Sequence, residues 1–201
     1  CLVGSEMCIR DRVEDIIKVG IARYKEKYLP GIKSEDPFVL YEKYSRRDVS
    51  LLMNCGKDLS SIMYGMKRIE NDVFIFITYH KEESQDEKNY VEGKPDYADA
   101  FEDDLIFKWD SQIGKGLDSS YMKDVLGADR KHLFVKKSDA ETSFYYMGQF
   151  DVLEARNAQK EDNRGRMQPI TKVTMKMHHA VREDLLRYLQ SVSYTHLRAH
   201  E

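Results

Sequence analysis

The sequence contains little cysteine, proline or glycine, and it has no long hydrophobic run. Its 201 residues include 3 Cys, 4 Pro and 11 Gly, and the longest unbroken apolar run is Val73–Ile77. Three cysteines cannot build a disulfide framework, so the expected location is the reducing cytoplasm. The low proline and glycine content argues against a low-complexity chain. An apolar run of this length is far too short to span a membrane, so no membrane partner is expected.

Neither sign of charge is in large excess. The chain has 32 Lys and Arg against 35 Asp and Glu, which gives a formal net charge of −3. This balance argues against a protein whose whole surface binds nucleic acid, but it is compatible with a local basic groove. The length is typical of one domain, and 41% hydrophobic residues are enough to bury a sizeable core.

The two ends of the chain differ from the rest. Residues 1–12 and 193–201 show no periodicity, and the N-terminal stretch lacks the arrangement of charged and apolar regions that a signal peptide has. Both ends resemble translated sequencing-adapter read-through, a scar found on metagenomic gene fragments. We therefore expect them to be artefactual extensions of a longer natural protein. Residues 13–35 are expected to be a helix and connector from an upstream region, and residues 36–192 the domain itself.

Between the ends, hydrophobic periodicity predicts an α+β domain. Ser45 and Asp48 form a capping-box pattern, which predicts a short helix after them. Val173, Met175 and Met177 alternate with polar residues, which is typical of an antiparallel strand with one face in the core. The predicted fold is a mostly antiparallel curved sheet or partly closed barrel with short flanking helices. We expect strands at residues 62–68, 73–80, 131–137, 143–153 and 170–178, further helices at 13–29, 118–126 and 182–189, a turn at 70–72, and polar loops at 82–96 and 157–167.

Several kinds of catalytic or cofactor site are disfavoured. His178 and His179 are adjacent, so on a strand they point to opposite faces and cannot chelate one metal ion. The segment Gly114–Gly116 lacks the spacing of a phosphate-binding loop. Cys55 is more consistent with a small buried hydrophobe than with a nucleophile. No metal or other cofactor is therefore expected, and no catalytic residue is assigned.

One enzymatic alternative stays open. A nuclease needs two or three carboxylates that converge on Mg²⁺. The acidic stretch around Asp99 supplies carboxylates in quantity, but it has no acidic pair followed by a lysine on a hydrophobic strand. A solvated acidic loop is the favoured interpretation, and the alternative is a metal-dependent nuclease that uses the carboxylates Asp99, Glu102, Asp103, Asp104 and Asp110.

Nucleic-acid recognition is better supported by the pattern of basic and aromatic residues. One predicted strand ends in Tyr79, His80 and Lys81, and on another strand His132 shares a face with Lys136. Lysines hold phosphates, whereas aromatic rings and histidine stack on bases. A tyrosine-rich sheet whose lysines extend to solvent would give the same pattern, and spacing alone does not decide between the two.

The sequence also resembles a known family along most of its length. Six segments carry the resemblance, in order: Tyr41–Val49 with Leu51–Asn54, Phe76–Lys81, Tyr97–Phe101, Phe107–Ser111, His132–Asp139 and Phe144–Gly148. They are similar to a bacterial domain of unknown function that is usually found at the C-terminus of large DEAD/DEAH-box helicases. These helicases often carry an N-terminal phospholipase-D-like nuclease domain. The chain departs from the family pattern at Cys55, where tryptophan is usual, and at residues 112–115, where an arginine-rich stretch is usual.

The resemblance implies a module of a DNA-handling ATPase in phage defence or DNA processing, and not a stand-alone enzyme. The implied partners are DNA and upstream helicase or nuclease domains of the same natural chain. By fold analogy alone, the pattern also looks like the PUA/SRA group of modified-base readers. In such a reader Tyr79, Trp109 and Tyr146 could form the aromatic walls of a base pocket, and Asp99 could accept a hydrogen bond from the base.

The favoured hypothesis is a non-catalytic nucleic-acid-binding domain that recognises DNA, including a modified base. Its rivals are the metal-dependent nuclease and a protein–protein adaptor that binds its partner through the tyrosine-rich sheet. The candidate nucleic-acid-binding residues, taken from the basic strands and the resembling segments, are Tyr44, Arg46, Tyr79, His80, Lys81, Asp99, Trp109, Ser111, His132, Lys136 and Tyr146.

Overall fold

The chain divides into two units, Cys1–Val39 and Leu40–Glu201. The computed structural model describes residues 12–23, 37–53, 55–80, 99–162 and 164–191. In the first unit, residues 12–23 form a helix with exposed side chains, and the rest of the helix expected at 13–29 lies outside the described residues. No helix in these ranges is long and apolar enough to cross a membrane.

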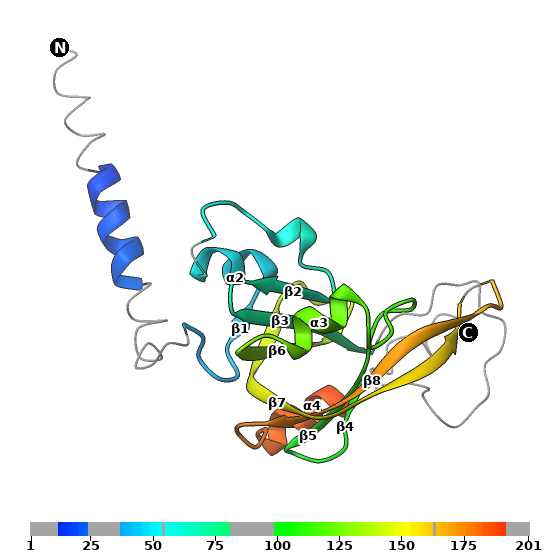
Figure 1. Ribbon diagram of the computed structural model, residues 1–201. Helices are drawn as coiled ribbons and strands as arrows, with labels where there is room; N and C mark the ends of the chain where they lie inside the picture. The colour runs from blue at the N-terminus through cyan, green and yellow to red at the C-terminus, as the bar shows by residue number, and fades with distance from the viewer. Residues whose placement is uncertain (1–11, 24–36, 54, 81–98, 163, 192–201) are drawn as a thin grey trace, which may run out of the picture. The chain divides into compact units, whose positions relative to one another are not determined.

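The second unit is built on one eight-stranded sheet (Figure 1). The strands are β1 (Lys43–Tyr44), β2 (Met66–Ile69), β3 (Asp72–His80), β4 (Ala100–Phe101), β5 (Ile106–Asp110), β6 (Arg130–Ser138), β7 (Phe144–Glu161) and β8 (Met167–Met177). Their order is β2-β3-β6-β7-β8-β5-β4, and β1 also pairs with β7. Only β3 and β6 run parallel among the described pairs. The α+β fold with a mostly antiparallel curved sheet is confirmed, and the sheet is open.

Short helices flank this sheet. They are α2 (Arg46–Leu52), the 3₁₀ helix η2 (Ser60–Ile62), α3 (Ser120–Leu126) and α4 (Glu183–Gln190). The predicted capping box at the start of α2 is confirmed: Asp48 N donates to Ser45 Oγ at 3.1 Å, and Ser45 N donates to Asp48 Oδ2 at 2.8 Å. These bonds satisfy two backbone donors that a helix start otherwise leaves unpaired, so α2 begins at a defined residue.

The main hydrophobic core lies on one face of the central strands. Val73 and Ile75 of β3 pack there with Leu133 of β6, and α3 and α4 add Val125 and Leu189. All five side chains are completely buried. The continuous apolar run of β3 has both of its faces buried, as expected for a central strand that is covered on each side.

A second, aromatic cluster covers the opposite face of the same strands. Phe134 of β6 stacks on Phe76 of β3 at 5.1 Å between ring centroids, and it meets Tyr44 of β1 edge-on at 6.3 Å. His132 and Lys136 share this face with Phe134, as the alternation predicted. His132 and Phe134 on this face are buried, and Tyr44 of β1 packs against Phe134.

Strands β7 and β8 are longer than the sequence predicted. Residues 157–167 were expected to form a flexible loop, but β7 continues to Glu161 and β8 begins at Met167. The two strands pair along this whole extension, from Asn157 opposite Thr171 to Glu161 opposite Met167. Figure 1 shows this hairpin running past the end of β5. We call the part from residue 156 to residue 172 the β7–β8 arm.

Candidate nucleic-acid interface

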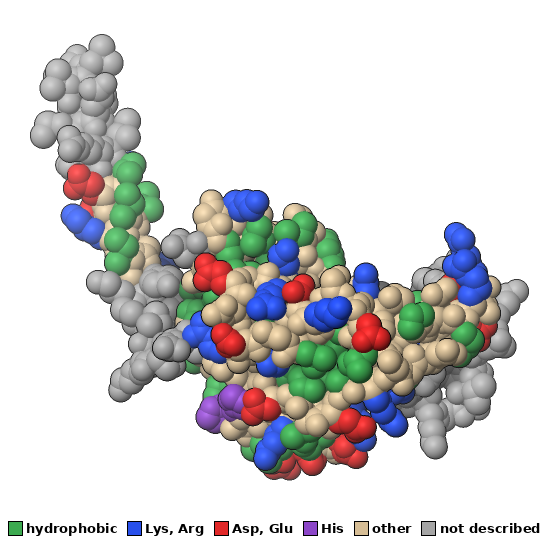
Figure 2. All heavy atoms as spheres, in the orientation of Figure 1, with side chains coloured by type: hydrophobic (Ala, Val, Ile, Leu, Met, Phe, Trp, Pro, Cys, Tyr) green, Lys and Arg blue, Asp and Glu red, His purple; other side chains and the backbone are tan. Residues whose placement is uncertain are grey.

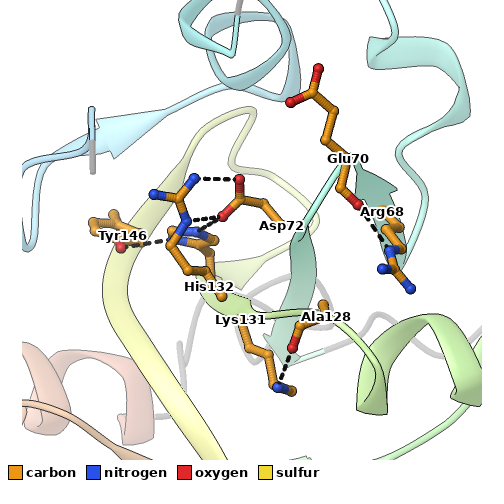
Figure 3. Close-up of polar contacts among 8 residues, drawn as sticks. Arg68, Glu70, Asp72, Ala128, Lys131, His132 and Tyr146 are labelled. Carbon is orange, nitrogen blue, oxygen red and sulfur yellow. Dashed lines mark hydrogen bonds and ion pairs between the residues drawn. The ribbon is translucent and has the colours of Figure 1, made fainter. Parts of the chain in front are cut away.

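Two of the expected site residues, His132 and Tyr146, belong to a buried polar network (Figure 3). The guanidinium of Arg130 forms a bidentate pair with the carboxylate of Asp72: Nε donates to Oδ1 at 2.6 Å, and Nη2 donates to Oδ2 at 2.8 Å. His132 Nε2 lies 3.1 Å from Asp72 Oδ1, and Nδ1 lies 3.0 Å from the hydroxyl of Tyr146. Because a carboxylate only accepts, Nε2 carries the proton of the bond to Asp72.

The network holds Asp72 as a carboxylate. Burial by itself raises the pKa of Asp72, but the hydrogen bonds and charges of His132 and Arg130 outweigh it and lower the pKa to about 2. The side chains of Asp72 and His132 are only 4% and 2% exposed, and Tyr146 is 1% exposed. The network therefore ties β3, β6 and β7 together, and of its four side chains that of Arg130 reaches solvent, with 32% of it exposed.

The hairpin turn predicted at residues 70–72 is found between β2 and β3, but Asp72 lies in the strand and not in the turn. The turn is formed by Glu70, whose φ is 51°, and Asn71, and Asp72 is the first residue of β3. The partners of Asp72 are 58 and 60 residues away in the chain, so no local pattern identifies them. The parallel pairing of β3 with β6 places Asp72, at the start of β3, beside Arg130 and His132 at the start of β6. The network can therefore be recognised only when this pairing is known.

Arg46, the first residue of α2, lies on the aromatic cluster at its solvent-facing edge. Its guanidinium carbon is 4.7 Å from the ring centre of Tyr64, 5.1 Å from that of Phe144 and 5.7 Å from that of Phe76. The Phe rings are buried, whereas Tyr64 is 64% exposed. Arg46 is half-buried between them. This stack of one cation on three rings is a cation–π arrangement that the sequence did not reveal, because Tyr64 showed no pattern of its own.

The charge of Arg46 has no carboxylate partner among the described residues. Its Nε–H is buried and donates to no acceptor among these residues. Burial lowers the pKa of the Arg46 guanidinium, and the electrostatic effect of Tyr64 opposes this only in part. The neighbouring Arg47 differs, because its Nε lies 3.5 Å from Asp58. Arg46 is thus a positioned cation whose charge no described acid neutralises, which is a suitable partner for a phosphate.

Asp99 and Trp109 lie close together, as their motifs suggested, but not around an open base pocket. Asp99 accepts a hydrogen bond from the backbone N–H of Asp110 at 2.9 Å, and Trp109 is 5% exposed and part of the main core. Tyr121 of α3 lies 6.3 Å from Trp109 and its hydroxyl is buried without a hydrogen-bond partner in the described structure. Burial and the charge of Asp99 both raise the pKa of Tyr121.

Most of the other expected site residues have structural contacts. Tyr44 is fully buried, Tyr79 is 7% exposed, and His80 Nε2 lies 2.7 Å from the carbonyl oxygen of Leu189. Lys136 Nζ donates to the carbonyl oxygen of Glu141 at 2.9 Å. Lys81 lies outside the described residues. The burial of Tyr79, Trp109 and Tyr146 means that they do not line a common surface on which a base could stack.

Ser111 anchors the loop that follows β5. Its Oγ accepts from the backbone N–H of Thr171 at 2.8 Å and donates to the carbonyl oxygen of Lys115 at 2.7 Å. Ser111 is 5% exposed and Thr171 is fully buried. Ser111 therefore fixes the base of the β7–β8 arm to the loop, and its hydroxyl is not available to a ligand.

A shallow depression of about 360 Å³ lies over β4, β5, β8 and β7. Its carboxylates are neutralised in pairs: Lys108 lies 2.9 Å from Glu102, and Lys172 lies 3.8 Å from Asp110. Within the described ranges no three His, Cys, Asp or Glu side chains gather to hold a metal ion. The geometry therefore offers the nuclease alternative no cluster of converging carboxylates in these parts of the chain.

The family model of a domain of unknown function, DUF3427, matches residues 38–189. The chain belongs to the DUF3427 family. The match contains all six sequence segments, from Tyr41 to Gly148, which confirms the resemblance to a domain of unknown function. Among curated proteins, no sequence matches this chain.

Solved structures resemble the DUF3427 chain only distantly. The MspJI restriction endonuclease in complex with a 27-mer oligonucleotide is 12% identical at a TM-score of 0.35, over 52% of this chain and 28% of that one. SUVH6 of Arabidopsis thaliana is 9% identical at a TM-score of 0.46, over 81% of this chain and 30% of that one. The sulfur-binding and SRA domains of ScoMcrA with phosphorothioated DNA are 8% identical at a TM-score of 0.40, over 77% of this chain and 45% of that one. The chain thus spans less than half of each of these proteins, and at these TM-scores the likeness assigns no function.

Proposed function

We propose that the DUF3427 domain is a non-catalytic module that binds DNA for a larger DNA-handling protein. The observation that carries this proposal is the guanidinium of Arg46, which is held on the exposed ring of Tyr64 and has no carboxylate partner among the described residues. A phosphate bound at the guanidinium of Arg46 would offset the cost of its half-buried charge. Tyr64 offers a flat exposed ring beside it, on which a base or sugar can pack.

The larger protein would be a helicase or a helicase–nuclease. This part of the proposal rests on the resemblance of the six segments to the C-terminal domain of DEAD/DEAH-box helicases. A binding module fits such an arrangement because the ATPase would supply the energy and the module would supply the contact with DNA. Recognition of a modified base is the finer form of the hypothesis, and it would require aromatic side chains that the described conformation keeps buried.

The charge of Arg46 can be tested against that of its neighbour. We expect Arg46→Gln to weaken binding of a DNA duplex about tenfold at 0.1 M salt, because one phosphate contact is lost. Arg47→Gln is the matched control: Arg47 lies in the same helix and is 72% exposed, but it pairs with Asp58. Fluorescence anisotropy with labelled DNA measures both affinities, and circular dichroism melts check that both variants fold.

Equal binding by Arg46→Gln and Arg47→Gln would contradict the role assigned to Arg46. Cleavage of the DNA in the presence of Mg²⁺ would instead favour the nuclease alternative. If the wild-type chain bound no nucleic acid at any salt concentration, the protein–protein adaptor would become the better explanation, and Tyr64 with its neighbours would be its first candidate contact.

A further inference from the structure

The β7–β8 arm is a two-stranded ribbon that leaves the sheet. The last pair that β8 shares with β5 is Lys172 opposite Asp110, and beyond it β8 pairs only with β7 among the described strands. The paired positions from Asn157 opposite Thr171 to Glu161 opposite Met167 give a ribbon of roughly 15 Å. Two strands alone bury little apolar surface, so a ribbon of this length is stable only with support from other parts of the chain.

The base of the arm is held firmly. The backbone N–H of Leu117 donates to Asn157 Oδ1 at 2.8 Å, and Gly114 N donates to the carbonyl oxygen of Pro169 at 2.9 Å. The junction of Ser111 with Thr171 adds a buried contact on the same side. At the tip, Asp162 accepts hydrogen bonds from the backbone N–H groups of Arg164 and Arg166. The loop after β5 and this turn therefore fix the direction of the arm and the shape of its end.

Basic and amide side chains dominate one face of the arm. Opposite residues of an antiparallel pair share a face, so Arg156 and Lys172 lie on the same side as Lys160 and Gln168. Arg156, Lys160 and Arg164 are exposed, and no described carboxylate forms an ion pair with them. Figure 2 shows Lys and Arg side chains gathered at the free end of the hairpin. This concentration of positive charge occurs in a chain whose net charge is negative.

We infer that the β7–β8 arm enters the major groove of duplex DNA. The inference rests on the proposed DNA-binding function and names the contact that reads the duplex. The major groove of B-form DNA is wide enough for a two-stranded ribbon, and Arg, Lys and Gln side chains are those that hydrogen-bond to base edges there. The major groove of an RNA duplex is too narrow for such a ribbon. The arm therefore selects DNA, with Arg156, Lys160 and Arg164 near phosphates or guanines and Gln168 near an adenine.

The test compares two double variants of the full chain. Lys160→Gln/Arg164→Gln removes two charges from the arm, and Lys67→Gln/Lys123→Gln removes two from β2 and α3. Binding of one DNA duplex and of an RNA duplex with the same sequence is measured by anisotropy at several salt concentrations. We expect the arm variant to lose about tenfold in DNA affinity per lost contact at 0.1 M salt, and its salt slope to be smaller by about two. The control variant should bind like the wild type, and the RNA duplex should bind more weakly.

A footprint locates the groove. Methylation of guanine N7 by dimethyl sulfate reports on the major groove, so the wild-type chain should protect N7 and the arm variant should protect it less at the same protein concentration. If the wild type binds DNA and the arm variant binds equally well, or if N7 stays reactive, the arm assignment is overturned while the DNA-binding function stands. Equal affinity for the RNA duplex also overturns it. Failure of the wild type to bind DNA at all overturns the proposed function and the arm with it.

Discussion

Replacing Asp72 with alanine is expected to lower the free energy of unfolding by about 3–5 kcal/mol. The substitution leaves His132 buried without its acceptor and frees the guanidinium of Arg130 from its bidentate partner. The loss is large because the carboxylate of Asp72 accepts three hydrogen bonds, and the almost fully buried ring of His132 loses one of its partners where water does not replace it. Asp151→Ala is the matched control, since Asp151 pairs with His178 on the surface and is 73% exposed. We expect it to change stability by less than about 1 kcal/mol.

The same carboxylate gives a dependence on pH. Its pKa is about 2 in the folded protein against 3.8 in the unfolded chain, so it stabilises the fold above pH 3.8. That contribution, about 2 kcal/mol, is lost as the pH falls from about 4 to about 2. Urea unfolding across this range measures it. The Asp72→Ala variant should lose this part of the acid dependence, and an identical acid profile in wild type and variant would contradict the network.

Replacing Phe134 with alanine is the second large effect we expect, with a loss of about 3–5 kcal/mol. The ring is fully buried, and its centroid lies 5.0 Å from the ring centroid of Tyr146 and 5.1 Å from that of Phe76. Its removal leaves a cavity at the centre of the aromatic cluster, which the strands around it cannot close. Leu153→Ala, at a position that is 57% exposed, should change stability by no more than about 0.5 kcal/mol.

Thermal and urea unfolding of both variants provide the measurement. A small effect of Phe134→Ala would mean that the cluster repacks easily and does not form a rigid support. In that case Phe76, which stacks on Phe134, would also not hold Arg46 in a fixed position. The stability of the cluster and the geometry of the proposed phosphate contact are therefore linked.

Local signals in the sequence predicted local structure well. The capping box of Ser45 and Asp48 needs only four consecutive residues, and the alternation of Val173, Met175 and Met177 directly reflects one buried face of β8. The β7–β8 arm was missed for the same reason. Most of its side chains on both faces are polar and exposed, so no apolar period marks it, and its strands are held by pairing with each other.

The candidate site was predictable only in part. Arg46 was identified through a resembling segment, but its partner Tyr64 comes near it only through the fold. Trp109 and Tyr146 were expected at a surface because aromatic residues near polar motifs often bind ligands. In the structure they alternate inward on paired strands, and burial of their large rings stabilises the core. Sequence spacing cannot separate these two roles until the strand order is known.

The salt dependence of DNA binding by the full chain shows whether Arg46 and the β7–β8 arm hold phosphates. We expect the affinity for a DNA duplex to fall linearly with salt on logarithmic axes, with a slope of about −0.9 for each phosphate contact, and the DNA to stay uncut in Mg²⁺. A chain that shows no binding at low salt, or whose binding does not change as salt rises, would contradict the claim that Arg46 and the β7–β8 arm hold nucleic acid through its phosphates.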